Sequence, residues 1–430
     1  MSAAPYPWLA AFARGDWADG VERLRAFLRD NPAHAEARRH LGLALEATGD
    51  PSGAEACFRA LLTERPDDPD LLVDLGSLVE AAGRDGEAAS CFDAALTAAP
   101  DHLRANGAKA LLCLRRGDYA EGWRRFEARW QTPYYRAIDR RFLQPPWRGA
   151  DSLAGRVLFL HAEHAFGDTL QFCRYARLAA DAGARVVLEV QPALADLLAG
   201  LDARVRVTTR GAPLPDFDLH CPLLSLPLAF GTTLATIPAA PSYLAADPAR
   251  VARMGRLIPA LERPGVKVGV AWAGNPYPGD PAAQVVDRRR SVAPAALAPL
   301  GRLAGITLVS LQAGPAAATP DRPGGEALVD PMGAVRDFAD TAAVIAGLDL
   351  VVTVDTAVAH LAGALGRPVW LLDRFDHCWR WLRGRTDSPW YPSLTIFRQP
   401  RPGDWADPVA RVAAGLAAFG NSCPPGPAMR

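Results

Sequence analysis

One continuous segment shows most plainly how the chain folds: Leu348-Asp-Leu-Val-Val-Thr-Val354, then Asp355-Thr356, then Ala357-Val-Ala-His-Leu-Ala-Gly-Ala-Leu365. The first run is apolar and rich in β-branched side chains, which predicts a buried strand, and the Ala- and Leu-rich run predicts a helix. Similar strand-like runs form two sets, at 156–161, 184–190, 205–207 and 217–219, and at 266–272, 306–311 and 368–372. Helical segments such as 169–182 and 192–200 separate strands of the first set. This alternation predicts two parallel, doubly wound, Rossmann-like halves that bind ligands beyond the carboxyl ends of their strands.

The first 135 residues repeat with a period of 34. The repeated positions are the glycines Gly15, Gly49, Gly83 and Gly117, the apolar residues Leu24, Phe58, Phe92 and Phe126, and the prolines Pro32, Pro66 and Pro100. A 34-residue period with a turn glycine and a closing proline resembles the tetratricopeptide repeat. Each repeat is a helical hairpin that stacks on its neighbours, so we expect a superhelix with a concave groove for a peptide or another protein. The alternative is an array that only supports the next domain or mediates dimerisation.

Composition narrows the class of protein. Lys+Arg and Asp+Glu are both 47, so the formal charge of zero argues against a sequence-independent binder of nucleic acid or anionic lipid. Hydrophobic residues make up 50% and charged residues 22% of the 430, which is enough apolar material for about three packed domains. No apolar run reaches about 18 residues, and the start of the sequence lacks a secretory pattern. The seven cysteines form no CxxC pair, so we expect reduced thiols in a cytoplasmic protein without an integral membrane segment.

Polar residues follow two of the predicted strands at the point where a helix begins. Gly167-Asp168 follows the strand at 156–161, and Asp355-Thr356 follows the strand at 348–354. A helix start offers unpaired backbone N–H groups and the positive end of the helix dipole, which suits a diphosphate. The alternative is that Asp168 and Asp355 are only N-caps.

Three motifs together resemble a known enzyme family. Gly167-Asp168, Trp272-Ala-Gly-Asn275 and Val354-Asp-Thr-Ala-Val-Ala-His-Leu-Ala-Gly-Ala-Leu-Gly-Arg-Pro368 are similar to the heptosyltransferase-type glycosyltransferases of the GT-B fold. With the repeats and the segment Trp379-Arg-Trp381, nearly the whole chain resembles bacterial tetratricopeptide-glycosyltransferase proteins. The resemblance implies an N-terminal all-α tetratricopeptide superhelix followed by two Rossmann-like domains of a GT-B fold. The chain departs from the family at His164-Ala165-Phe166, in the proline-rich stretch 275–291, and at 373–378.

The resemblance also implies roles for individual residues. Asp168 matches the catalytic base for the acceptor hydroxyl, where placement matters more than strength. The implied donor-binding residues are Asn275, Arg288, Arg290, Asp355, Thr356, Ala357, Val358 and His360. Those expected on the acceptor or sugar side are Glu163, His164, Gly167 and Trp379. Three of these assignments have alternatives. The Arg288-Arg-Arg290 run is then a solvated loop, His360 is a packing residue on its helix, and Trp379 is an aromatic residue that pins a loop.

The expected reaction needs no cofactor and no metal. Asp216-Phe-Asp218 resembles a metal-binding DxD, but we interpret it as structural because no typical order surrounds it. The absence of GxxxxGK[ST] and of a complete GxGxxG argues against nucleoside-triphosphate hydrolysis and dinucleotide redox chemistry. We therefore expect an inverting glycosyltransferase that moves a sugar from a nucleotide sugar to Ser or Thr of a protein held by the repeats, such as flagellin. Transfer to lipopolysaccharide and a non-catalytic adaptor are the alternatives, and homo-oligomerisation is left open.

The predicted organisation has six parts. They are the repeat array at 1–135, a linker at 136–152 with a further helix near 138–142, an acceptor-side half at 153–245, a linker at 246–264, a donor half at 265–420 and a tail at 421–430.

Overall fold

The computed structural model describes residues 6–163, 165–275, 281–319 and 321–422. These residues form two compact units. The first contains the described parts of Met1–Arg116 and Pro276–Arg288, together with Arg124–Ala137. The second contains Gly117–Trp123 and the described parts of Ile138–Asn275 and Arg289–Arg430.

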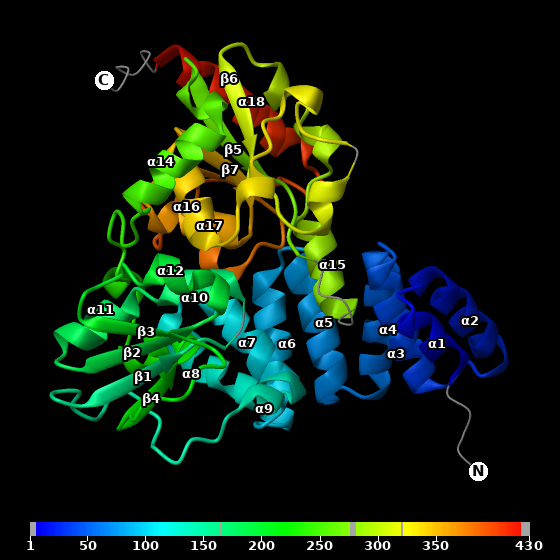
Figure 1. Ribbon diagram of the computed structural model, residues 1–430. Helices are drawn as coiled ribbons and strands as arrows, with labels where there is room; N and C mark the ends of the chain where they lie inside the picture. The colour runs from blue at the N-terminus through cyan, green and yellow to red at the C-terminus, as the bar shows by residue number, and fades with distance from the viewer. Residues whose placement is uncertain (1–5, 164, 276–280, 320, 423–430) are drawn as a thin grey trace. The chain divides into compact units, whose positions relative to one another are not determined.

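The first unit is built from paired helices, shown from blue to cyan in Figure 1. Its helices are α1 (Pro7–Ala13), α2 (Trp17–Asp30), α3 (Ala35–Ala47), α4 (Pro51–Glu64), α5 (Pro69–Ala81), α6 (Asp85–Ala98), α7 (Leu103–Arg116) and α9 (Pro133–Ile138). Gly49 and Gly83 have φ angles of 89° and 83°, which let the chain turn between the two helices of a hairpin. The aromatic residues at the repeated positions, Phe58 and Phe92, are fully buried. The prediction of a tetratricopeptide-type array is confirmed.

The further helix predicted near 138–142 is wrong in position. Helix α9 begins at Pro133 and ends at Ile138. Proline favours the first turn of a helix because its missing N–H would have no intrahelical partner there. Arg141 has a φ angle of 47°, which is incompatible with continuing a right-handed helix.

The second unit contains two parallel sheets. The first has the strand order β3-β2-β1-β4 and the second the order β6-β5-β7-β8-β9. The strands are β1 (Val157–His161), β2 (Arg185–Val190), β3 (Val205–Thr209), β4 (Leu219–Pro222), β5 (Val266–Ala271), β6 (Ile306–Ser310), β7 (Leu350–Val354), β8 (Val369–Asp373) and β9 (Leu394–Arg398). Every residue of β7 is buried, as its β-branched sequence predicts. The predicted fold class, helical repeats followed by two Rossmann-like domains, is confirmed.

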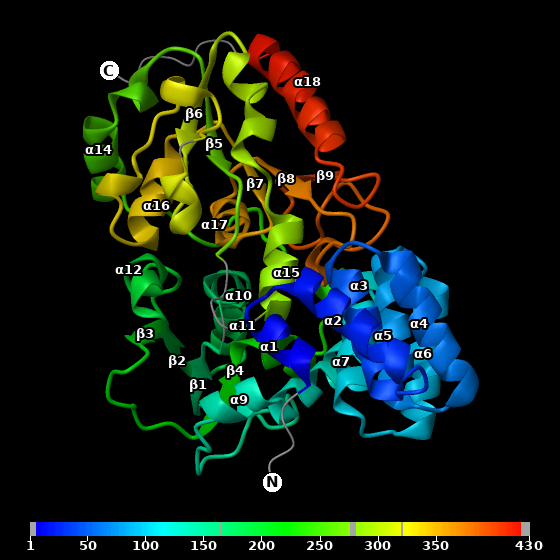
Figure 2. The ribbon, with the colours of Figure 1, turned by 90° about the vertical axis from the view of Figure 1, so that its right-hand side faces the viewer.

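Further helices precede, connect or follow these strands along the chain. They are α8 (Tyr119–Phe126), α10 (Phe166–Phe172), α11 (Tyr175–Asp181), α12 (Ala195–Leu198), α13 (Leu226–Ala229), α14 (Pro248–Leu257), α15 (Pro281–Arg290), α16 (Phe338–Ala346), α17 (Ala357–Ala364) and α18 (Ala406–Ser422). Two of them cross the division into units: Tyr119–Trp123 of α8 and the last two residues of α15 belong to the second unit. Figure 2 shows α18 beside the second sheet, where Val412 and Leu416 are fully buried. Within the part of the chain that the structure describes, no helix is long and apolar enough to span a bilayer.

Candidate functional site

Helices α10 and α17 meet closely within the second unit. Each follows the carboxyl end of a strand, α10 after β1 and α17 after β7. A Cβ added at Gly167 would lie 2.8 Å from Cδ2 of His360 and 3.7 Å from Cα of Ala357. Glycine is therefore the residue that allows this approach. The structure thus brings together the motif Gly167-Asp168 and the predicted donor residues of α17.

Neither predicted aspartate is an N-cap. Helix α10 begins at Phe166 with Ala165 at the cap, so Asp168 is the third residue of the helix. The cap of α17 is Thr356, whose side-chain Oγ1 accepts a hydrogen bond from the backbone N–H of Val358 at 3.3 Å. The capping alternative for Asp168 and Asp355 is therefore wrong. Asp355, half-buried, lies one residue before the cap.

Arg380 joins the loop after β8 to α10. Its guanidinium donates a hydrogen bond to Oδ1 of Asp168, and its Nε donates to Oε1 of Gln171 at 2.5 Å. The guanidinium carbon also lies 4.4 Å from the ring centre of Trp379. Burial disfavours the charged form of Arg380, but the negative charges of Asp168 and Asp355 outweigh it and raise its pKa. Arg380 was not predicted as a site residue, although a cation between two tryptophans in a loop after a strand was a usable signal.

The three candidate phosphate arginines lie on α15 but differ in surroundings. Arg290 donates a hydrogen bond from its guanidinium to the backbone oxygen of Asp355 at 3.2 Å. Arg289 pairs with the carboxylate of Asp376 at 3.3 Å. Arg288 is exposed and belongs to the part of α15 that groups with the repeats. The structure therefore brings Arg290 to the start of α17.

The loop after β5 is held by a buried glutamine. Oε1 of Gln312 accepts hydrogen bonds from the backbone N–H groups of Trp272 and Ala273, each at 2.9 Å. The N–H of Gly274 donates to the hydroxyl of Ser291 at 3.3 Å. These contacts fix the backbone that leads to Asn275, and the side chain of Asn275 is exposed.

His360 and Trp379 are enclosed by protein. Nδ1 of His360 lies 2.8 Å from the hydroxyl of Tyr391, and its ring stacks on Trp381 with centroids 5.5 Å apart. Burial, and next the charge of Arg380, lower the pKa of His360 to about 4, so the ring is neutral at neutral pH. Trp379 is 5% exposed and packs edge-on against Trp123 at a centroid distance of 5.1 Å. These contacts agree with the alternative interpretations, in which His360 is a packing residue on its helix and Trp379 pins a loop.

The remaining acceptor-side residues are partly placed. Glu163 is buried, and its carboxylate accepts a hydrogen bond from the backbone N–H of Leu224 at 2.8 Å. His164 lies outside the residues that the structure describes.

The motif Asp216-Phe-Asp218 makes a structural contact at the beginning of β1. The carboxylate of Asp218 accepts a hydrogen bond from the backbone N–H of Val157 at 2.7 Å.

A second buried arginine anchors the same region. Arg174 follows α10, and its guanidinium donates to the backbone oxygen of Trp390 and to the hydroxyl of Tyr243, each at 2.8 Å. The hydroxyl of Tyr243 donates in turn to the backbone oxygen of Leu170 at 2.7 Å. This network ties the end of α10 to the segment before β9, and Tyr391 of that segment contacts His360 of α17.

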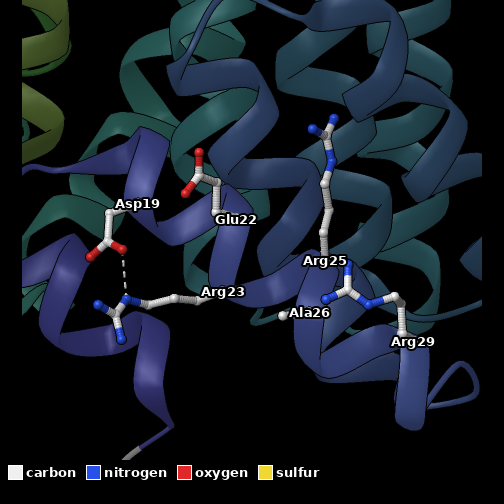
Figure 3. Close-up of a pocket in the computed structure, with 6 residues that line it drawn as sticks. All are labelled: Asp19, Glu22, Arg23, Arg25, Ala26 and Arg29. Atoms are coloured by element: carbon white, nitrogen blue, oxygen red, sulfur yellow. Dashed lines mark hydrogen bonds and ion pairs between the residues drawn. The ribbon is translucent and has the colours of Figure 1, made fainter.

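An open hollow lies elsewhere, in the first unit (Figure 3). It is lined by Asp19, Glu22, Arg23, Arg25, Ala26 and Arg29. All six belong to α2, and the Asp19 carboxylate pairs with Arg23 at 2.7 Å. The hollow is open and is lined by a single helix, whereas a ligand pocket encloses most of its ligand.

Models of known protein families match separate parts of the chain, the repeats and a segment of the second unit. Residues 9–69 and 47–112 match tetratricopeptide repeat models, and residues 335–372 match the model of glycosyltransferase family 9 (heptosyltransferase). The chain thus joins tetratricopeptide repeats to a segment that matches the family 9 model. That segment contains β7, α17 and most of β8, so it includes the donor-binding candidates Asp355 to His360.

Individual proteins are similar over longer stretches. Protein FlbA of Caulobacter vibrioides is 29% identical over 340 residues, which are 73% of this chain and 55% of FlbA. The chain thus spans about half the length of that relative. A family 9 glycosyltransferase structure from Veillonella parvula covers 63% of this chain and 99% of its own, with 10% identity and a TM-score of 0.47. The crystal structure of MamA covers 31% of this chain and 77% of its own, with 19% identity and a TM-score of 0.27.

Proposed function

We propose that this chain is an inverting, metal-independent glycosyltransferase that moves a sugar from a nucleotide sugar to a hydroxyl group of a protein. The observation that supports it most is the close approach of α10 and α17. It sets Gly167-Asp168 against the segment that matches the glycosyltransferase family. A base on one Rossmann-like half and a phosphate-binding helix start on the other are what a displacement at an activated sugar requires.

In the proposed reaction the carboxylate of Asp168 accepts the proton of the acceptor hydroxyl. The acceptor oxygen forms a bond to the anomeric carbon while the bond from that carbon to the phosphate oxygen breaks. Because attack and departure occur on opposite faces, the configuration inverts. A carboxylate suits this role because the hydroxyl becomes acidic only as the new bond forms.

The leaving phosphate would be stabilised by α17 and Arg290. The first-turn N–H groups of a helix have no intrahelical acceptor, and the helix dipole adds partial positive charge. The Val358 N–H is engaged by the Thr356 cap, so we assign the phosphate contacts to the N–H groups of Thr356 and Ala357. The guanidinium of Arg290, at the backbone of Asp355, supplies the cation. Fixed donors and a cation of this kind can stabilise a departing phosphate without a metal.

The tetratricopeptide repeats support a protein acceptor. Arrays of this type present a concave surface for a peptide or another protein. We therefore propose Ser or Thr of flagellin or of another surface protein as the acceptor, modified in the cytoplasm before export.

Asp168→Asn tests the proposal in the full-length protein. Binding of UDP-, GDP-, ADP- and CMP-activated sugars is measured by calorimetry, and transfer to purified flagellin is followed by intact mass. We expect at least one donor to bind. The variant should keep that affinity and lose about 10²- to 10⁴-fold in transfer rate, the usual contribution of a general base. Asp181→Asn, an exposed carboxylate at the end of α11, is the matched control.

Each outcome decides a separate part of the proposal. Full transfer by Asp168→Asn would remove the base assignment. Transfer to a lipopolysaccharide core, with none to protein, would replace the acceptor. If the native protein binds none of these donors, the adaptor alternative is favoured.

A further inference from the structure

The pair formed by Arg380 and Asp168 connects residues 212 positions apart in the sequence. Arg380 lies in the segment 374–381, called here the β8 loop because it follows β8 directly. Asp168 lies in the first turn of α10. The side chains are 14% and 16% exposed, so the ion pair is largely shielded from water and from screening by salt.

Arg380 contacts α10 at two points. Asp168 and Gln171 are three residues apart and therefore neighbours on one helix face. The guanidinium donates to the carboxylate of Asp168 with one nitrogen and to the amide oxygen of Gln171 with another. Because the planar guanidinium is held at both Asp168 and Gln171, its orientation is fixed. The direction of its hydrogen bond to the Asp168 carboxylate is therefore fixed as well, which a single contact would not achieve.

The β8 loop supports the guanidinium from its own side. Its Nη1 donates to Sγ of Cys378 at 3.3 Å, and its face lies against Trp379. The charged or titratable groups recorded near Arg380 include Asp355, before α17, together with Cys378, Tyr119 and Tyr391. His360, within α17, lies near both Arg380 and Asp168. Asp355 carries a like charge to Asp168, whereas the guanidinium of Arg380 is hydrogen-bonded to the Asp168 carboxylate, and such a contact favours the ionised form of a carboxyl group.

We infer that Arg380 is a positioning residue for the base: it holds the Asp168 carboxylate ionised and oriented. This inference rests on the proposed function, because it assumes that Asp168 accepts the acceptor proton. A carboxylate can accept several hydrogen bonds, so the contact with Arg380 is compatible with a bond from the acceptor hydroxyl.

The test compares Arg380→Ala and Arg380→Lys with the native full-length protein, using the donor and acceptor found in the panel above. For Arg380→Ala we expect unchanged donor affinity and a fall in kcat of about 10²-fold, typical of a misplaced reacting group. The acid limb of the rate profile should move to higher pH by about one to three units, because an adjacent arginine lowers the pKa of an aspartate by that amount. Arg380→Lys keeps the charge but not the fork, so its acid limb should stay near that of the native protein while kcat falls.

Arg385→Ala is the matched control, since Arg385 is a more exposed arginine of the same region that pairs with Asp387. It should leave both kcat and the acid limb unchanged. If the native protein transfers sugar and Arg380→Ala keeps its kcat and acid limb, the positioning role is wrong and the proposed function stands. A loss of kcat without a shift of the acid limb also contradicts it, since disturbed folding alone would give that result. A native protein inactive with every donor would overturn the proposed function instead.

Discussion

At the scale of single residues, His360 shows how burial sets the chemistry of a side chain. Its pKa is lowered to about 4 from 6.5, so between these values the unfolded chain binds a proton that the folded protein does not. Stability therefore contains a contribution from His360 that is complete above pH 6.5 and is lost as the pH falls toward 4. The full loss is on the order of 3 kcal/mol.

We predict that His360→Gln gains stability relative to the native protein as the pH falls from 6.5 toward 4, because the variant lacks the contribution that the native protein loses in this interval. Glutamine does not titrate, and its amide can still hydrogen-bond the hydroxyl of Tyr391. Burial raises the pKa of Asp373 to about 7, which gives a stability contribution of opposite sign in the same pH interval. The measurement is therefore the difference in Tm between native and variant protein from pH 4 to 8. A difference that does not change with pH would contradict the prediction.

Sequence analysis predicted some site residues better than others for a physical reason. Gly167 and Asp168 in the first turn of α10, and Thr356 at the cap of α17, lie where a helix begins after a strand, and local spacing indicates such places. Arg380 acts through a partner on a distant segment, which local spacing cannot indicate. Trp379 was predicted on the acceptor or sugar side, and its enclosure depends on Trp123, far away in the sequence.

At the scale of elements, the repeat helices predict opposite effects for the same substitution at two glycines. Gly76 in α5 is buried, and an added Cβ would lie 2.5 Å from Cε1 of Phe92. Gly76→Ala should therefore cost about 1–3 kcal/mol, as overpacking of a core does. Gly107 in α7 has nothing within 4 Å of an added Cβ. Gly107→Ala should stabilise the protein by about 0.8–1 kcal/mol through helix propensity alone.

The two variants serve as controls for each other because both change glycine to alanine within a repeat helix. Urea unfolding followed by far-ultraviolet circular dichroism gives the order of stability. Hydrogen exchange of peptides from α5 and α7 shows whether each effect is local. If both variants change the free energy of unfolding by the same amount in the same direction, the packing of Phe92 on Gly76 does not determine the effect of the substitution.

The elements themselves followed from periodicity where one pattern dominated. β7 was predictable because it is continuously apolar and β-branched. β9 was missed because its sequence, Leu-Thr-Ile-Phe-Arg, is short and follows a run of aromatic residues and prolines. The predicted helix at 169–182 is two helices, α10 and α11, separated by a tight turn in which the N–H of Ala176 donates to the oxygen of Cys173.

At the scale of the whole molecule, the repeat period and the packing of side chains place the end of the repeat array at different residues. The 34-residue period continues to Phe126, but residues 117–123 group with the second unit. Tyr119 of α8 accepts a hydrogen bond from the indole of Trp390 at 3.0 Å, and Trp123 packs on Phe172 and Trp379. Periodicity records how segments resemble one another, whereas the partners of a buried side chain depend on the folded chain.

This arrangement predicts that Trp123→Ala damages the second unit although Trp123 lies in a repeat helix. Trp123 is 1% exposed, and replacing a buried tryptophan with alanine costs about 3–5 kcal/mol. Trp8→Ala is the matched control, because Trp8 is fully buried in the core of the first unit and donates its indole N–H to His40. Hydrogen exchange of the full-length variants should show faster exchange at 166–182 and 379–391 for Trp123→Ala, and within α1 to α3 for Trp8→Ala. Faster exchange confined to the repeats in both variants would mean that α8 belongs energetically to the array, and that the proposed transferase half does not need it to fold.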